Sequence, residues 1–341
     1  MTTTRPGMWV AVALILAPLA AAQSYTVTDL GTLGGGNNSI PAAINDQGAV
    51  VGNATLSNGD QHAFVWTSTT GMRDLGTLGG AAAQSGARGI NGSGEVAGFS
   101  YLADGVTYRA FLWTTSAGMQ DLGTLGGSYS VANGINDAGE VVGCAYLADG
   151  VSLHGFLWTA AAGMRDLGTL GGDTSCAQGI NQSGEVAGFS YLADKLTYHA
   201  FLWTQFGGIQ DLGAFGGSNS LGCAINKSGA IAGLGYAPPN TSQPVAALWT
   251  TNHRMRSLAT GPNSIALGLN DSNQIVGYFG KNSGAALLWT STGDAQNLNN
   301  LIPPNSGWSL IQAWGINRSG QITASGTIGS GTHAALLTPT N

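Results

Sequence analysis

Short apolar segments separated by turns rich in glycine and asparagine recur along almost the whole chain. Between residues 128 and 172, a small-residue segment leads into a turn at Asn136, Val141 and Val142 lie in the next apolar segment, and Phe156 and Trp158 lie in the one after. Segments rich in β-branched and aromatic residues and bounded by Gly, Asn and Asp are typical of strands. The pattern therefore predicts four strands here, at 128–136, 140–146, 154–159 and 164–170.

This pattern repeats with a nearly constant period. A phrase of the form Gly-Ile-Asn-x-x-Gly-x-Val-x-Gly recurs, and its Asn positions are separated by 46, 45, 45, 45, 44 and 47 residues. A fixed period in this range indicates a repeat architecture. The seven repeats are called units one to seven, and their phrases contain Asn45, Asn91, Asn136, Asn181, Asn226, Asn270 and Asn317.

The Asn-x-x-Gly turn can be predicted in detail. The Asn side chain accepts a hydrogen bond from the backbone two residues on. The fourth residue needs a positive φ, which Gly adopts freely and which Asn tolerates best among the other residues. Unit six has Asn273 at this position, which supports the assignment. A small residue follows further on, Gly52 in unit one and Ala324 in unit seven, and we expect a neighbouring sheet to approach closely there.

The number of strands per repeat and the two chain ends indicate the fold. Four strands per unit predict a β-propeller, and a solenoid is the alternative. The last unit stops after its third strand at 333–337, whereas 25–33 reads as a fourth strand without a unit before it. A ring in which the N-terminal strand completes the last blade removes both exposed edges. We predict one all-β domain over residues 23–341, a closed seven-bladed β-propeller with four antiparallel strands per blade.

Residues 1–22 differ from the repeats. Arg5 precedes an almost wholly apolar run at 8–19, and three alanines follow at 20–22. This order is typical of a secretory signal peptide, and the run is shorter than the ~20 apolar residues of a membrane span. We expect a secreted chain, extracellular, periplasmic or at the cell surface, with no membrane span after cleavage. An uncleaved anchor is the alternative.

Composition narrows the possible partners. The chain has 55 glycines, 8% charged residues and a net charge of −6, and its apolar content of 43% argues against disorder. No cluster of Lys and Arg is present, so nucleic acid is not expected as a partner. A monomer is expected. Cys144, Cys176 and Cys223 occupy different positions in their units, which favours small buried residues, with one disulfide as the alternative.

Units one to four also share two further phrases. His-Ala-Phe-Leu-Trp, or a close variant, occurs at 62–66, 109–113 and 199–203, and Asp-Leu-Gly-Thr-Leu-Gly-Gly follows it. These phrases resemble the HAF repeats of bacterial extracellular proteins. The resemblance covers essentially the whole mature chain, although units six and seven lose the second phrase. It implies secretion and a repeat architecture, and it implies no reaction and no catalytic residue.

The residues that usually carry catalysis occur here at repeated positions. Because equivalent positions in different blades are spread around a ring, we expect no metal site, no cofactor and no catalytic residue. The histidines are predicted to have a structural role at the start of the third strand, and the glutamates after the turn Gly to be solvated. These residues are His62, His154, His199, His333, Glu95, Glu140 and Glu185.

The best candidates for a binding site are loops found only in units two to four. Each follows a second strand and begins Tyr-Leu-Ala-Asp, and loops on a rigid scaffold commonly carry function. Tyr and Asp suit contacts with carbohydrate or peptide, whereas a solvated β-turn is the alternative. The predicted ligand-binding residues are Tyr101, Asp104, Tyr146, Asp149, Tyr191 and Asp194.

Together these observations favour a secreted, non-enzymatic scaffold that binds a glycan or an extracellular protein. The first alternative is a secreted hydrolase or lyase with its active site at the mouth of the channel. The second is a module of cell-surface assembly without a small ligand.

Overall fold

The computed structural model describes residues 24–80, 83–216, 219–237, 242–258, 260–280 and 284–340. The predicted signal peptide, residues 1–22, lies outside the described residues. Apart from a short 3-10 helix, η1 (Leu298–Asn300), the regular structure of the described residues is β-strand. The all-β prediction is confirmed.

The strands follow the repeats of the sequence, and within each unit they pair antiparallel in chain order. Unit one contains β2 (Gly35–Ile44), β3 (Val50–Leu56), β4 (Gln61–Thr67) and β5 (Gly71–Asp74). Unit two contains β6 (Ser85–Ile90), β7 (Val96–Tyr101), β8 (Tyr108–Thr114) and β9 (Gly118–Asp121). Unit three contains β10 (Gly126–Ile135), β11 (Val141–Leu147), β12 (Leu153–Thr159) and β13 (Gly163–Asp166).

The later units have the same order of strands. Unit four contains β14 (Gly171–Ile180), β15 (Val186–Leu192), β16 (Tyr198–Thr204) and β17 (Gly208–Asp211). Unit five contains β18 (Ser220–Ile225), β19 (Ile231–Tyr236), β20 (Pro244–Trp249) and β21 (Met255–Ser257). Unit six contains β22 (Ser264–Leu269), β23 (Ile275–Phe279), β24 (Ala285–Trp289) and β25 (Ala295–Asn297). Unit seven contains β26 (Ser309–Ile316), β27 (Ile322–Ile328) and β28 (Gly331–Thr340).

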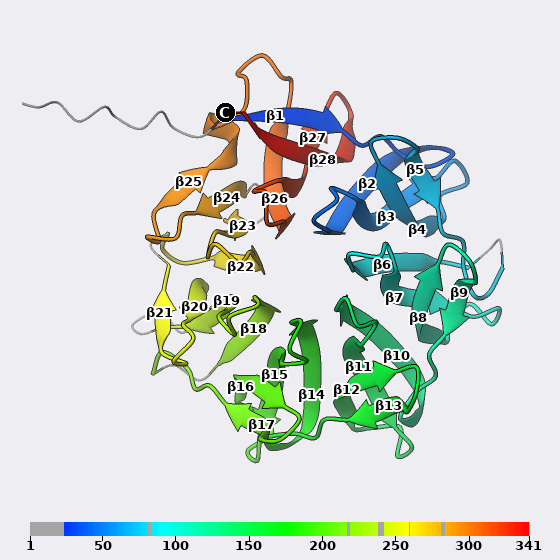
Figure 1. The fold of residues 1–341 in the computed structure, drawn as a ribbon, viewed down its shortest axis with the longest axis vertical. Helices are drawn as coiled ribbons and strands as arrows, with labels where there is room; N and C mark the ends of the chain where they lie inside the picture. Colours follow the sequence, from blue (N-terminus) through cyan, green and yellow to red (C-terminus); the bar gives the residue numbers. More distant parts are fainter. Residues whose placement is uncertain are drawn as a thin grey trace, which may run out of the picture.

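The N-terminal strand lies in the sheet of unit seven. β1 (Ser24–Asp29) pairs antiparallel with β28, from Ser24 opposite Thr340 to Asp29 opposite Ala335. It thereby covers the edge that β28 would otherwise expose. Figure 1 shows the two strands side by side although they come from opposite ends of the sequence.

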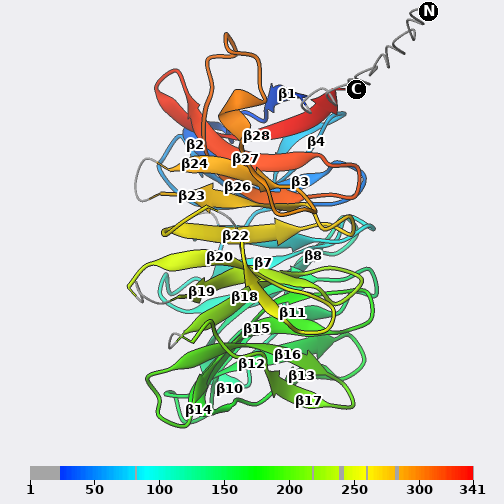
Figure 2. The same cartoon turned by 90° about the vertical axis from the view of Figure 1, so that its left-hand side faces the viewer.

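The sheets are arranged around a common centre, with the first strand of each unit innermost (Figure 1). Seen from the side, neighbouring sheets stack on one another (Figure 2). The turns between first and second strands, which contain the repeated Asn, lie at one end of the channel, here called the Asn face. The opposite end, called the loop face, carries the loops 102–107, 148–152 and 193–197, which connect second and third strands.

Buried side chains hold neighbouring units together. Phe111 and Trp113 of unit two pack with Val51 and Ala63 of unit one in a single buried cluster. Similar clusters join other neighbouring units, for example Phe156 of unit three with Ala110 of unit two. Burial of aromatic side chains of this size is a major favourable term in folding. The repeated phrases around Phe and Trp therefore supply contacts between units.

The reason why only a small residue fits at the position of Gly52 differs from the one predicted. A Cβ atom on Gly52 would lie 2.1 Å from the carbonyl oxygen of Ile40 and 2.8 Å from Cα of Pro41. Both atoms belong to the paired strand of the same sheet, where the register shifts between Pro41 and Ala43. The prediction of an approaching neighbouring sheet was wrong, because a β-bulge in the same sheet excludes the side chain.

Candidate functional site

The repeated Asn makes two kinds of hydrogen bond. In unit three, Oδ1 of Asn136 accepts from the backbone N–H groups of Ala138 at 3.1 Å and Glu140 at 3.0 Å. The bond to the residue two positions on confirms the predicted turn. In addition, Nδ2 of Asn136 donates to the backbone oxygen of Asn181 in the next unit, at 3.2 Å. One side chain therefore closes its own turn and bonds to the neighbouring sheet.

This bond between units occurs at every repeat, and the last Asn bonds back to the first. Since a buried amide that is left without a partner is costly, each bond favours one spacing of neighbouring sheets. The pairs, donor first, are Asn45 to Asn91, Asn91 to Asn136, Asn136 to Asn181, Asn181 to Asn226, Asn226 to Asn270, Asn270 to Asn317 and Asn317 to Asn45.

The glutamates after the turn assist this arrangement. Oε2 of Glu95, Glu140 and Glu185 each accepts a hydrogen bond of 2.7 Å from Nδ2 of the Asn in the same unit. The three side chains are half-buried, so the prediction that they are solvated was incomplete. They act as second acceptors for the buried Asn amides.

The histidines bond to the aspartates of the Asp-Leu-Gly phrase. Nδ1 of His62 lies 2.8 Å from Oδ2 of Asp74, and Oδ1 of the same Asp accepts from the N–H of Gly76. The pairing links the third strand to the end of the fourth, as the predicted structural role requires. The other three pairs are His154 with Asp166, His199 with Asp211, and His333 with Asp29. Within the described residues, no group of three or more His, Cys, Asp or Glu side chains could hold a metal ion.

The predicted aspartates of the loop face are engaged in local bonds. Oδ1 of Asp149 accepts from the N–H groups of Val151 and Ser152, both at 2.9 Å, and Oδ2 accepts from the Ser152 hydroxyl at 2.7 Å. The bond from the Ser152 hydroxyl is the main reason why the pKa of Asp149 falls to about 2. Asp104 and Asp194 make the equivalent bonds. These carboxylates therefore fix the shape of the loops.

Each of these loops presents an aliphatic side chain to solvent. Val106, Val151 and Leu196 occupy the same position in units two, three and four, and they are 64%, 73% and 80% exposed. Single exposed apolar residues are ordinary, but equivalent ones on three neighbouring sheets form a repeated feature. The loop face of units two to four is thus a rigid surface with apolar tips.

The predicted tyrosines join two aromatic groups beside these loops. In the first group, Tyr101 lies 5.5 Å from Tyr108 between ring centroids, Tyr108 lies 4.8 Å from Tyr129 of unit three, and Tyr129 lies 5.9 Å from Tyr146. Phe99 completes this group. Tyr108 and Tyr129, which were not among the predicted binding residues, therefore connect Tyr101 with Tyr146. All four tyrosines are half-buried.

The second aromatic group joins units four and five. Tyr191 lies 5.4 Å from Tyr198 between ring centroids, and Phe189 lies 5.8 Å from Tyr198. A side-chain hydrogen bond connects Tyr198 to Tyr236 of unit five. Tyr108 and Tyr198 begin the third strands of their units. An aromatic residue at this repeated position is the feature of the sequence that could have predicted their place in the aromatic groups.

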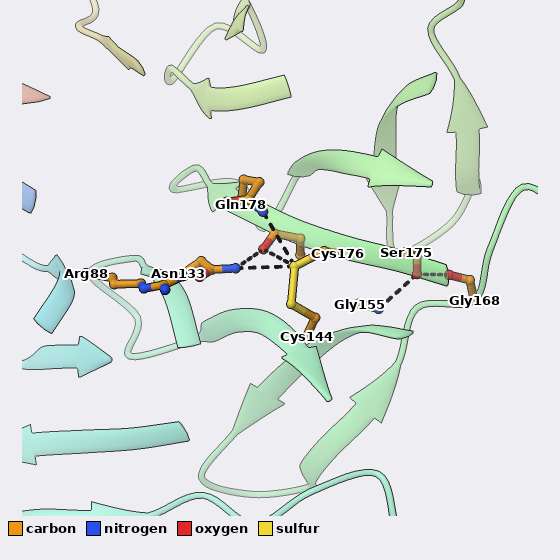
Figure 3. Close-up of a disulfide and its surroundings, with 9 residues drawn as sticks. Arg88, Asn133, Cys144, Gly155, Gly168, Ser175, Cys176 and Gln178 are labelled. Atoms are coloured by element: carbon orange, nitrogen blue, oxygen red, sulfur yellow. Dashed lines mark hydrogen bonds between the residues drawn. A yellow bond between two sulfur atoms is a disulfide. The ribbon is translucent and has the colours of Figure 1, made fainter. Parts of the chain in front are cut away.

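A disulfide takes the place of the aromatic group between units three and four. Cys144 in β11 occupies the position of Phe99 and Phe189, and it is bonded to Cys176 in β14 (Figure 3). The prediction of buried unpaired cysteines was wrong for this pair, and the alternative of one disulfide is confirmed. Cys223 is free.

The centre of the molecule contains a cavity with a variable lining. Each first strand has a register shift, and the extra residue of this β-bulge lies three positions before the repeated Asn. Bulges commonly redirect one side chain, and here the bulged residues line a channel cavity of about 270 Å³. They are Ala42, Arg88, Asn133, Gln178, Cys223, Leu267 and Trp314.

The two mouths of the channel differ. The Asn-face mouth, of about 400 Å³, is lined by Asp46, Asp137 and Asp271 and by Arg318, which forms ion pairs of 3.4 Å with Asp46 and Asp271. Toward the loop face, a cavity of about 500 Å³ has apolar walls and a few polar groups. Its lining includes Ile40, Ile265, Ile311, Tyr278 and Gln312.

Antiparallel four-stranded units around a central channel define the β-propeller class of fold. The sequence matches no protein-family profile and no curated protein. Among solved structures, the chain is similar to the β-propeller domain of the Trilobed protease from Pyrococcus furiosus, which is described as having an open velcro topology. The identity is 8%, the TM-score is 0.56, and the match covers 88% of this chain and 95% of that domain.

Two further structures share this fold. TolB from Acinetobacter baumannii matches with 10% identity and a TM-score of 0.50, over 72% of this chain and 61% of TolB. A puromycin hydrolase matches with 14% identity and a TM-score of 0.54, over 90% of this chain and 52% of the hydrolase. The chain thus spans less than two thirds of the length of either protein, and at these identities the likeness shows the fold alone. In the part of the chain that the structure describes, no helix has the length and apolar character needed to cross a bilayer.

Proposed function

We propose that the chain is a secreted bacterial HAF-repeat protein, a seven-bladed propeller closed through β1, that binds a partner on its loop face. The pairing of β1 with β28 and the return of the Asn bonds from Asn317 to Asn45 support the closed ring. The disulfide supports an oxidising compartment, because disulfides persist mainly in secreted and periplasmic proteins.

The partner proposed for the loop face is a glycan, with an extracellular protein as the second possibility. The observation that carries this proposal is the pair of half-buried tyrosine groups beside the exposed loop tips. A tyrosine offers an apolar ring face together with a hydroxyl group, which suits the C–H faces and hydroxyls of a sugar. In this proposal Tyr101, Tyr146 and Tyr191 contact the ligand, and Asp104, Asp149 and Asp194 hold the loops in place.

A hydrolase or lyase that used the loop-face aspartates as its acid has less support than a binding protein. A general acid that works near neutral pH needs a raised pKa. The pKa values of Asp104, Asp149 and Asp194 are lowered instead, mainly by hydrogen bonds from their own loops. Carboxyl groups of this kind stay ionised and are poor proton donors.

A glycan array and a variant pair test the proposal. The double variant Tyr101→Ser, Tyr108→Ser removes two rings of the first aromatic group, and we expect glycan binding to fall about tenfold or more, as for the loss of central aromatic contacts. Phe206→Ser is the matched control, because Phe206 is 99% exposed in the turn between β16 and β17, at the other end of the strands. The control should bind like the unchanged chain.

Two results would contradict the proposal. One is the absence of any bound glycan on the array together with the absence of a protein partner in a pull-down. The other is a tyrosine variant that binds as well as the Phe206 control.

A further inference from the structure

Arg88 is a cation in a channel whose described lining has no acidic residue. Its Nη1 donates to Oδ1 of Asn133 at 2.6 Å, and its Cζ lies 5.2 Å from the centroid of the Phe99 ring. None of the ion pairs among the described residues includes Arg88. The guanidinium group therefore lacks a protein counter-ion.

This lack of a counter-ion favours an anionic ligand. An arginine side chain stays protonated in proteins, so Arg88 is a cation at physiological pH. The side chain of Arg88 is exposed to solvent in the channel, so an anion that enters the channel can reach it. The hydrogen bond to Asn133 uses only one N–H donor of Arg88. The remaining N–H groups are available for a carboxylate or another oxyanion. Guanidinium groups bind such anions through two parallel hydrogen bonds.

The residues beside Arg88 form a polar wall on units two to four. Nδ2 of Asn133 donates to the backbone oxygen of Ala177 at 2.8 Å, and Nε2 of Gln178 lies 3.5 Å from Sγ of Cys176. Figure 3 shows these side chains grouped around the disulfide, with Arg88 joined to Asn133. The disulfide-bearing strand β14 thereby orients both amides.

The opposite wall, on units five to seven, is apolar. It consists of the bulged residues Cys223, Leu267 and Trp314. Burial raises the pKa of the Cys223 thiol to about 12, so the thiol is neutral at physiological pH. The Trp314 indole N–H donates to Oγ of Ser325 at 3.1 Å, which holds the ring in position. The channel thus offers a cation on one side and an indole and a leucine on the other.

We propose that this channel binds a small organic monocarboxylate with an apolar body. The carboxylate bonds to Arg88, and the body packs against Leu267 and Trp314. Entry is from the loop face, because the aspartates of the Asn-face mouth repel anions. The cavity of about 270 Å³ restricts the ligand to a small molecule, since typical pockets for drug-sized ligands begin at ~300 Å³.

The test uses phenylacetate, its uncharged analogue phenylacetamide and inorganic phosphate as probes. Isothermal titration calorimetry and tryptophan fluorescence measure their binding to the full chain. We expect phenylacetate to bind at one site. Phenylacetamide should bind about tenfold more weakly or worse, because it lacks the charged hydrogen bond to Arg88. Phosphate should also bind about tenfold more weakly or worse, because it lacks the apolar contact.

Variants locate the site. Arg88→Gln should weaken phenylacetate about tenfold or more and make it resemble phenylacetamide. Arg73→Gln is the matched control, because the Arg73 guanidinium also lies over an aromatic ring, that of Trp113, but outside the channel lining. It should leave phenylacetate binding unchanged.

Several outcomes would overturn the proposal. They are no saturable binding of phenylacetate, equal binding of phenylacetamide, equal binding of phosphate, or an Arg88→Gln variant that binds like the Arg73→Gln control. Should Arg88→Gln fail to fold, the comparison of the three probes on the unchanged chain still decides between these results.

Discussion

At the scale of single residues, the repeated Asn concentrates several hydrogen bonds at one buried position. Asn136 is 1% exposed, and its amide group bonds within its turn, to Glu140 and to Asn181 of the next unit. Few side chains could replace it, because the position needs an acceptor for two N–H groups and a donor for two oxygens. The constancy of this residue along the repeats follows from that requirement.

Replacing one of these residues should be costly. For Asn136→Ala we expect the free energy of unfolding to fall by about 2–4 kcal/mol, because buried backbone groups lose their partners. Urea unfolding followed by tryptophan fluorescence measures this change. Asn305→Ala is the control, since Asn305 is exposed in a turn and should have little effect. An Asn136 variant as stable as this control would show that the bond between units adds nothing.

Residue chemistry predicted part of these sites. The bond from Oδ1 to the second following N–H follows from turn chemistry alone. The bond of Nδ2 to the next unit depends on the distance between two sheets, which no single repeat contains. The sequence also shows that the residue before Gly-Ile-Asn varies between units, for example Arg88 and Trp314. It does not show that these side chains line the channel, because the β-bulge that directs them there depends on the pairing of two strands.

At the scale of elements, local patterns predicted the first three strands of unit three well. The fourth strand was predicted at 164–170 but ends at Asp166. Asp166 accepts the N–H of Gly168, whose φ of 78° turns the chain away from the sheet. The phrase Asp-Leu-Gly therefore ends the strand, and the apolar Leu167 beyond it is buried without belonging to the sheet.

The disulfide connects two elements that no strand pairing joins. Cys144 and Cys176 are 32 residues apart in sequence and link the second strand of unit three to the first of unit four. The double variant Cys144→Ser, Cys176→Ser should lower the free energy of unfolding by about 3–4 kcal/mol, from the loop-closure entropy of a loop of this length.

Denaturant unfolding with and without dithiothreitol measures the effect. The reductant should destabilise the unchanged chain. It should leave the double variant unaffected, and the double variant is therefore the control. Equal stability of the oxidised chain and the variant would mean that the packing of units three and four needs no covalent link.

At the scale of the whole molecule, the fold depends on a contact between the two ends of the described chain. The spare strand at the start and the missing strand at the end were both evident in the sequence, and β1 does pair with β28. The sheet of unit seven is assembled from two segments that are distant in sequence, whereas the four strands of each other unit follow one another along the chain. The loops proposed to bind a partner occur only in units two to four, so the features shared by all units could not assign them a role.

Removing β1 should therefore have a large effect. A chain that starts at Leu30 leaves the edge of β28 unpaired, and we expect lower stability and self-association through that edge. Size-exclusion chromatography with light scattering measures the association. A chain that starts at Ser24 is the control and should behave as a single species. A monomeric, equally stable chain without β1 would contradict the proposed role of this strand in closing the ring.

The antiparallel register of β1 and β28 also has a mechanical consequence. Ser24 lies opposite Thr340, so force applied at these two residues acts on one end of the ladder and opens it pair by pair, toward Asp29 and Ala335. Force applied between two interior loops would instead load many backbone hydrogen bonds at once. We therefore expect the pairing of β1 with β28 to separate at low force when the chain is pulled by Ser24 and Thr340.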